Sequence, residues 1–159
     1  MQLGRIMVRR ITLRQIMARL LVLALAVSRP LAGAAGESEF GDISVRYSAI
    51  TTNQLFPAIA QRYGLERSDR NGLVNVAIEH KTGSGTSAMI AADVSGTVAD
   101  LSGHRRPIRF RETNEEGAID YLGTFAIDAG GTHVFTIVVN VPGHSQAYTV
   151  TFNRDYVLD

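Results

Sequence analysis

Residues 107–152 decide the fold, and they read PIRFRETNEEGAIDYLGTFAIDAGGTHVFTIVVNVPGHSQAYTVTF. Large apolar side chains occupy every second position in four runs, as in β-strands that bury one face. The runs are separated by NEEG (114–117), DAGG (128–131) and PGHS (142–145), which all have turn compositions. The stretch therefore predicts four antiparallel strands joined by short turns. The expected inward positions are Ile108, Phe110, Ile119, Tyr121, Phe125, Ile127, Phe135, Ile137, Val139, Val141, Tyr148, Val150 and Phe152.

The parity of these positions predicts how the first two runs pair. Taking 114–117 as the loop between them, we expect Arg111 opposite Asp120 on the outer face. In the same register, Phe110 lies opposite Tyr121 on the inner face.

Three further strands are predicted upstream, over about 42–50, 74–80 and 88–99, after a short acidic leader. Gly96 inside the last of them indicates a bulge or a close backbone approach. Residues 68–72 (SDRNG) have the composition of a turn, and their Asn-Gly pair is expected to supply positive φ.

One short helix is predicted over 56–64, because Pro57 suits a first helical position and Gly64 suits the position just past the end. About seven strands at short spacing with one brief helix are typical of an immunoglobulin-like antiparallel β-sandwich. We therefore predict an all-β fold of that architecture.

The N-terminus has the composition of a secretory signal peptide. A basic region is followed by the apolar run 20–27, which is too short to span a bilayer, and by the small residues 32–34. Residues 1–35 are therefore predicted to be a signal peptide, and 36–159 a single β-sandwich domain in the periplasm without a membrane span. An uncleaved amphipathic membrane anchor is the alternative.

Charge and cysteine content exclude several classes of function. After residue 35 the chain holds ten basic and 15 acidic residues, a net charge of −5, whereas nucleic-acid binding needs a basic face. The chain has no cysteine, which excludes disulfides and thiol chemistry, so the hydrophobic core alone must hold the domain.

A small periplasmic hydrolase is one alternative function. Residues 143–147 (GHSQA) approach the G-x-S-x-G elbow of serine hydrolases, which requires a helix after the serine. Residues 148–152 alternate as a strand instead, so Ser145 is expected in a hairpin turn. No catalytic residue is assigned, and a non-enzymatic role is favoured.

A periplasmic metal-binding protein is the second alternative. His80, His104, His133 and His144 are the candidate ligands, but none pairs at i, i+2 or i, i+4, as a local site prefers. His80 ends a predicted strand while His104 and His144 lie in turns, so several histidines are placed to gather at one end of the fold. Isolated surface histidines are favoured, and neither metal nor cofactor is assigned.

The densest basic run is 104–111, where Arg109 and Arg111 are expected to point outward. A solvated, ion-paired strand face is favoured, and a docking patch for an acidic partner or a lipid headgroup is the alternative. Glu112 has inward parity and is expected to reach the rim of the fold.

Several short motifs follow one another along the chain. They are Phe40-Gly41-Asp42, Phe56-Pro57 with Ala60–Leu65, Gly72–Val76, Val94-Ser95-Gly96, Asp100–Gly103, Phe110-Arg111-Glu112 and Glu116–Leu122. In this order and spacing, the chain resembles the small exported proteobacterial proteins grouped as the domain of unknown function 4426 family. The resemblance implies a periplasmic β-sandwich; it implies no activity and carries over no functional residue.

These observations favour a non-catalytic binding or accessory module that docks a partner through loops or by strand addition at an open sheet edge. The segment 53–71 is the expected docking surface, because it breaks the strand pattern and functional residues favour loops on rigid scaffolds. Arg62, Tyr63, Arg67 and Arg70 are the candidate contact residues. The expected partner is an envelope protein, and the expected state is a monomer or weak dimer.

Overall fold

The computed structural model describes residues 35–83 and 85–158, so the predicted signal peptide lies outside it except for Ala35. The described residues form nine strands and two short helical segments, which confirms the all-β prediction. None of the helices described is long and apolar enough to cross a membrane. The elements are β1 (Ala35–Phe40), β2 (Ile43–Thr51), η1 (Thr52–Gln54), α2 (Pro57–Tyr63), β3 (Asn71–Lys81), β4 (Ser87–Met89), β5 (Asp93–Ala99), β6 (Arg105–Glu115), β7 (Ala118–Ala126), β8 (Gly131–Asn140) and β9 (Tyr148–Tyr156).

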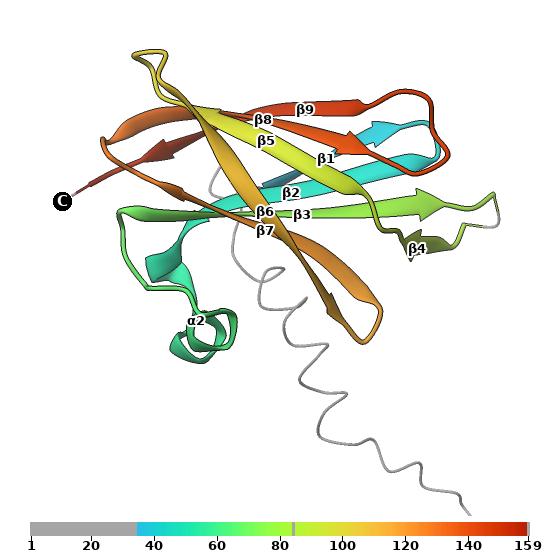
Figure 1. Ribbon diagram of the computed structural model, residues 1–159, viewed down its shortest axis with the longest axis horizontal. Coiled ribbons are helices and arrows are strands. Elements are labelled where there is room, and N and C mark those ends of the chain that lie inside the picture. Colours follow the sequence, from blue (N-terminus) through green and yellow to red (C-terminus); the bar gives the residue numbers. More distant parts are fainter. Residues whose placement is uncertain (1–34, 84, 159) are drawn as a thin grey trace, which may run out of the picture.

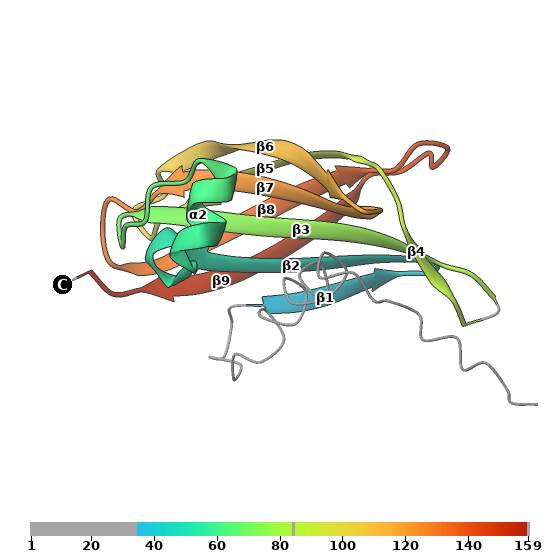
Figure 2. The same ribbon diagram turned by 90° about the horizontal axis from the view of Figure 1, so that it is seen from below.

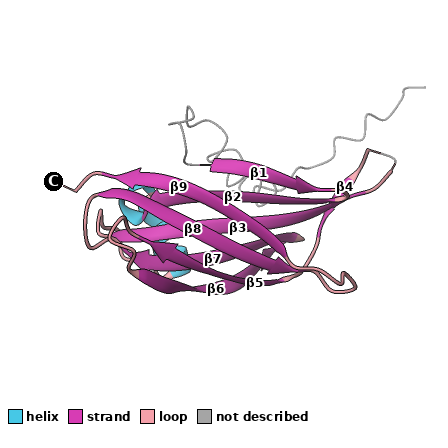
Figure 3. Cartoon of the chain, turned by 90° about the horizontal axis from the view of Figure 1, so that it is seen from above, coloured by secondary structure: helices cyan, strands magenta, loops and turns pink. Residues whose placement is uncertain are grey.

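The strands pair in one continuous antiparallel path, β1-β2-β3-β7-β6-β5-β8-β9, with β4 added beside β3. The sheet curves back on itself, so that its two end strands lie on the same side of a barrel-like body (Figure 1, Figure 3). The expected immunoglobulin-like arrangement of two separate sheets is therefore not confirmed. The two halves are continuous because β6 belongs to both, pairing first with β5 up to Ile108 and then with β7 from Arg109.

Phe110 forms the corner where β6 passes from one half to the other. A Cβ at Gly96 on β5 would lie 3.3 Å from its ring, and a Cβ at Gly123 on β7 would lie 2.8 Å from it. At Gly96 a Cβ would also lie 2.9 Å from the backbone carbonyl oxygen of Thr136, which confirms the predicted close backbone approach.

The turn between β6 and β7 is shorter than predicted. It consists of Glu116 and Gly117 alone, both with positive φ (52° and 89°), whereas 114–117 was expected to form the loop. Two residues at positive φ match the right-handed twist of a hairpin, so the strands continue pairing up to the turn itself.

The shorter turn changes the register of this hairpin. Arg111 lies opposite Leu122, and Phe110 opposite Gly123, so both predicted pairs were wrong by two residues. The predicted partners, Asp120 and Tyr121, remain on the expected faces because a shift of two positions preserves the side to which each side chain points.

Two strand boundaries also differ from the prediction. The expected acidic leader forms β1, and the expected single strand over 88–99 is divided at 90–92. At this break the chain leaves β3 and crosses to β8. The crossing is held by the Ala92 N–H, which donates to the Tyr121 hydroxyl at 2.7 Å.

Asn71 and Gly72 begin β3 and do not form the predicted positive-φ turn. Glycine is needed at position 72 for a different reason, because the Phe125 ring lies directly against the backbone. A Cβ at Gly72 would stand 2.0 Å from the Phe125 Cζ atom.

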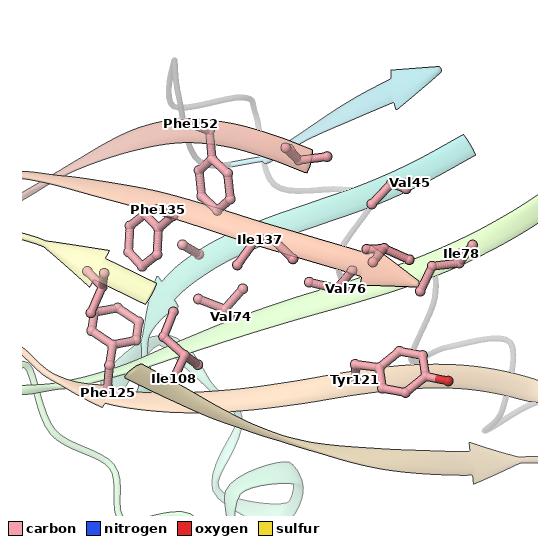
Figure 4. Packing of buried hydrophobic residues seen from close by; sticks show 14 of the residues in the cluster. Val45, Val74, Val76, Ile78, Ile108, Tyr121, Phe125, Phe135, Ile137 and Phe152 are labelled. Atoms are coloured by element: carbon pink, nitrogen blue, oxygen red, sulfur yellow. The ribbon is translucent and has the colours of Figure 1, made fainter. Parts of the chain in front are cut away.

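The core fills the interior of the curved sheet, and the predicted inward positions are confirmed (Figure 4). Phe135 is fully buried; its ring stacks on Phe152 at 4.8 Å between centroids and meets Phe125 edge-on at 5.1 Å. Aromatic rings fill the side where the sheet remains open. Phe40 of β1 packs on Tyr148 of β9 with 5.0 Å between the ring centroids, and Tyr47 of β2 stacks on Phe152 of β9 with 4.5 Å between them.

Candidate docking surface

Residues 53–71, here called the helical layer, lie on the outside of the sheet, where α2 covers β3 and its neighbours (Figure 1, Figure 2). The helix begins at Pro57 and ends at Tyr63, and Gly64, with a φ of 63°, follows just past the end, as predicted. Beyond the end, the Leu65 N–H donates to the Ala60 carbonyl oxygen at 2.8 Å, which satisfies an otherwise free helix carbonyl.

Polar side chains of β6 hold this helix against the sheet. The Tyr63 hydroxyl donates to one Glu115 carboxylate oxygen at 3.0 Å, and the Arg62 guanidinium lies 3.1 Å from the other. Arg111 donates to the Tyr63 carbonyl oxygen, and its guanidinium carbon lies 5.8 Å from the centre of the Tyr63 ring. Burial, and then the bond to Glu115, raises the pKa of Tyr63.

Thr52 fixes the part of the layer that follows the helix, residues 64–71, here called the return loop. Its side chain is 1% exposed, and its hydroxyl lies 2.7 Å from the Glu66 carbonyl oxygen and accepts the Ser68 N–H at 3.0 Å. Arg67 reinforces the same loop by donating to the Asn53 carbonyl oxygen at 2.8 Å. Three of the four predicted contact residues, Arg62, Tyr63 and Arg67, therefore make internal bonds.

Arg70 and Phe56 present their side chains to solvent. The Arg70 backbone is bonded, since its carbonyl accepts the Ile127 N–H at 2.8 Å, but its side chain is exposed. Phe56, which precedes the helix, is 66% exposed. Sequence reasoning missed Phe56; the available signal was a large aromatic outside every alternating run, beside a helix of only two turns.

A hollow of about 410 Å³ lies between the return loop and the end of β7. It is lined by Thr52, Gly64, Leu65, Glu66, Asn71, Thr124, Phe125 and Ala126. Most of these residues belong to the predicted docking segment or border it.

The histidines divide between the two ends of the barrel. His80 and His144 share one end: the His80 ring nitrogen lies 2.8 Å from an Asp42 carboxylate oxygen, and His144 lies 2.7 Å from the Tyr148 hydroxyl. The bond to His80 lowers the pKa of Asp42, and the charge of His144 adds to this. His104 and the buried His133 belong to the other end.

The other sequence candidates are placed as follows. Ser145 lies exposed in the loop between β8 and β9, as the turn interpretation predicted. Glu112 is exposed and accepts the Tyr121 hydroxyl at 3.0 Å, so it reaches the rim. In the basic run, Arg106 pairs with Asp128, whereas Arg111 bonds to the helical layer.

The geometry defines a barrel-like antiparallel domain that carries a helical layer on its outer surface. The family described as "Domain of unknown function (DUF4426)" matches residues 37–159, and the chain belongs to this family. A crystal structure of a DUF4426 family protein from Pseudomonas aeruginosa PAO1 is 36% identical to it. That alignment covers 79% of this chain and 97% of the other, with a TM-score of 0.66. No curated protein matches the chain.

Two structures of FetP from uropathogenic Escherichia coli strain F11 share the fold at 14% identity. One is the protein as isolated after expression in the periplasm, and the other is a copper-bound variant with a single substitution. Both have a TM-score of 0.57 and cover 79% of this chain and 95% or 96% of FetP. Among residues 35–83 and 85–158 of the present chain, no three His, Cys, Asp or Glu side chains are grouped to hold a metal ion.

Proposed function

We propose that this protein is an exported binding or accessory module without a catalytic role, which docks an envelope protein in the periplasm through the helical layer. The observation that carries the proposal is Phe56, a large aromatic side chain left 66% exposed on a layer that polar contacts attach to the sheet. Exposed aromatic side chains on fixed scaffolds are typical anchors of protein interfaces.

The charge of the layer indicates the chemistry of the partner. Residues 53–71 contain three arginines against one Glu and one Asp, a net charge of +1, whereas the chain after residue 35 has a net charge of −5. The rest of the chain after residue 35 thus carries a net charge of −6, and the helical layer is the one positively charged segment compared here. A partner segment with an apolar side chain beside acidic ones complements this surface.

The four candidate contact residues take different roles under this proposal. Arg70 contacts the partner directly, because its side chain is exposed. Arg62, Tyr63 and Arg67 fix the shape of the layer through their bonds to Glu115 and Asn53. A preformed surface loses less conformational entropy when the partner binds.

A site-specific photocrosslinker tests the docking surface in the full chain, expressed with its export sequence. Placed at Phe56 or Arg70, it is expected to capture one and the same envelope protein. Placed at Leu101, which is 77% exposed on the loop between β5 and β6, it is expected to capture none. Equal capture at all three positions, or a different protein at each, would show that the layer is not the docking surface.

Point substitutions distinguish residues that contact the partner from residues that fix the shape of the helical layer. Arg70→Glu, assayed with the crosslinker at Phe56, is expected to abolish capture while the thermal unfolding curve stays unchanged. Arg62→Glu is a poor substitute, because a carboxylate placed against Glu115 disturbs the layer itself. A metal scan of the same purified protein provides an independent check: metal retained at one equivalent after dialysis would replace docking with a metal-binding function.

A further inference from the structure

The free edge of β9 is a second surface, remote from the helical layer in the chain. β9 bonds to β8 on one side only, and together with β1 it forms the two ends of the sheet (Figure 3). An end strand leaves a row of backbone N–H and C=O groups available for pairing with another strand.

The two end strands are protected very differently. β1 has six residues and points Glu37 and Glu39 outward, with Lys81 beside them, and such charges discourage pairing with another chain. β9 has nine residues, and residues 148–153 (YTVTFN) contain neither a charge nor a proline. Alternating aromatic and β-branched residues of this kind have a high propensity for strand pairing.

We propose that β9 pairs antiparallel with β9 of a second copy of this chain, about a two-fold axis at Thr151. In that register Thr149 lies opposite Asn153 of the second copy, and Val150 lies opposite Phe152. Asp155 falls opposite Ala147, so no like charges meet. The part of each copy after residue 35 carries a net charge of −5, so contacts through its charged faces are repulsive and this uncharged edge is the favoured contact.

The side chains on the outer face are consistent with the same axis. Thr97, Thr136 and Thr151 lie in one row across β5, β8 and β9. The two-fold axis extends this row into six threonines over six strands, in which directly opposed threonines stabilise each pair.

The absence of cysteine from the chain permits a direct test in the full protein. Thr151→Cys places two thiols beside the axis, where Cβ atoms of opposed residues are about 4.5–5.5 Å apart and a disulfide bridges them with little movement. It is expected to form a covalent dimer under mild oxidation. Thr136→Cys, in the same row but on an interior strand, is the matched control and is expected to stay monomeric.

The register is tested by mixing two variants. Thr149→Cys and Asn153→Cys are expected to crosslink with each other and not with themselves. Thr151→Lys, which opposes two ammonium groups, is expected to weaken the dimer by roughly twofold to fivefold in sedimentation equilibrium with an unchanged circular dichroism spectrum. Crosslinking through Thr136→Cys as fast as through Thr151→Cys would mean that the copies meet by their faces, and a protein that stays monomeric throughout would equally overturn the proposal.

Discussion

The core and the helical layer are held in opposite ways, although the same strands support both. The core consists of apolar side chains with exposures near zero, whereas in α2 only Ala60 is buried. The layer depends instead on polar contacts to Glu115 and around Thr52. Burying a large apolar side chain stabilises a protein by about 1.5–3 kcal/mol, and a hydrogen bond by about 1 kcal/mol. The barrel therefore contributes most of the free energy of unfolding, and local unfolding of the layer requires less free energy than unfolding of the barrel.

The largest effect is expected from emptying the centre of the core. Phe135→Ala removes a fully buried ring that contacts both Phe152 and Phe125, and it should reduce the free energy of unfolding by about 3–5 kcal/mol in urea titrations. Thr136→Ala, on the neighbouring outward-facing position, is the control and should change it by less than about 1 kcal/mol. Similar losses for both variants would mean that the core is not centred on these rings.

The next largest effect is expected from adding a single methyl group at Gly72, where the Phe125 ring lies against the backbone. Gly72→Ala forces a Cβ to within 2.0 Å of a buried ring atom of Phe125, and overpacking of this kind costs about 1–3 kcal/mol. Gly83→Ala has nothing within 4 Å and should be nearly neutral. Thermal unfolding of both variants checks the difference, and a stable Gly72→Ala protein would contradict the close approach.

The alternation of apolar residues was sufficient to predict the interior of the barrel. It failed at Gly72 and at the β6–β7 turn, and in both places the reason lies outside the local pattern. Glycine satisfies a positive φ and a close ring contact equally well, so an Asn-Gly pair does not reveal which of the two applies. A turn of two residues and a loop of four differ in register while leaving the faces unchanged.

The path of the sheet was not predictable for a related reason. Period-two alternation identifies strands but not their partners, and β6 pairs with β5 in one half and β7 in the other. The docking residues show the same limit. The sequence placed Arg62 and Tyr63 in the predicted short helix, but only the fold shows that Glu115, more than 50 positions away, binds both of them.

The layer itself is tested by Thr52→Val, which keeps the shape of a buried side chain and removes its hydroxyl. The Glu66 carbonyl and the Ser68 N–H each lose a partner, at a cost of about 1–2 kcal/mol. Because the loss is local, hydrogen exchange should accelerate in residues 64–70 while the core strands keep their protection. Thr124→Val, exposed beside the same hollow, is the control and should leave the exchange unchanged. Uniform acceleration over the whole chain would show that layer and barrel unfold as one unit.

The smallest effect is expected at alkaline pH, where a tyrosine of the helical layer and a tyrosine of the core should ionise at different pH values. Burial raises the pKa of Tyr63 in the layer and, to a much greater extent, that of Tyr156 in the core. A folded-state pKa above the unfolded value of about 10 means that the neutral phenol stabilises the fold below that pH, and that the contribution disappears as the pH rises through the folded pKa. Tyr63 should therefore ionise before Tyr156 and release α2 from Glu115, and Tyr156 should ionise only when the barrel opens. Phenolate absorbance of the wild type and Tyr63→Phe, followed together with hydrogen exchange of α2, measures the two steps.

Tyr63→Phe should reduce the free energy of unfolding by no more than about 1 kcal/mol at neutral pH, since the side chain is half-buried, and it should abolish the early step alone. Persistence of that early step in Tyr63→Phe would assign it to another tyrosine and remove the alkaline distinction between layer and core.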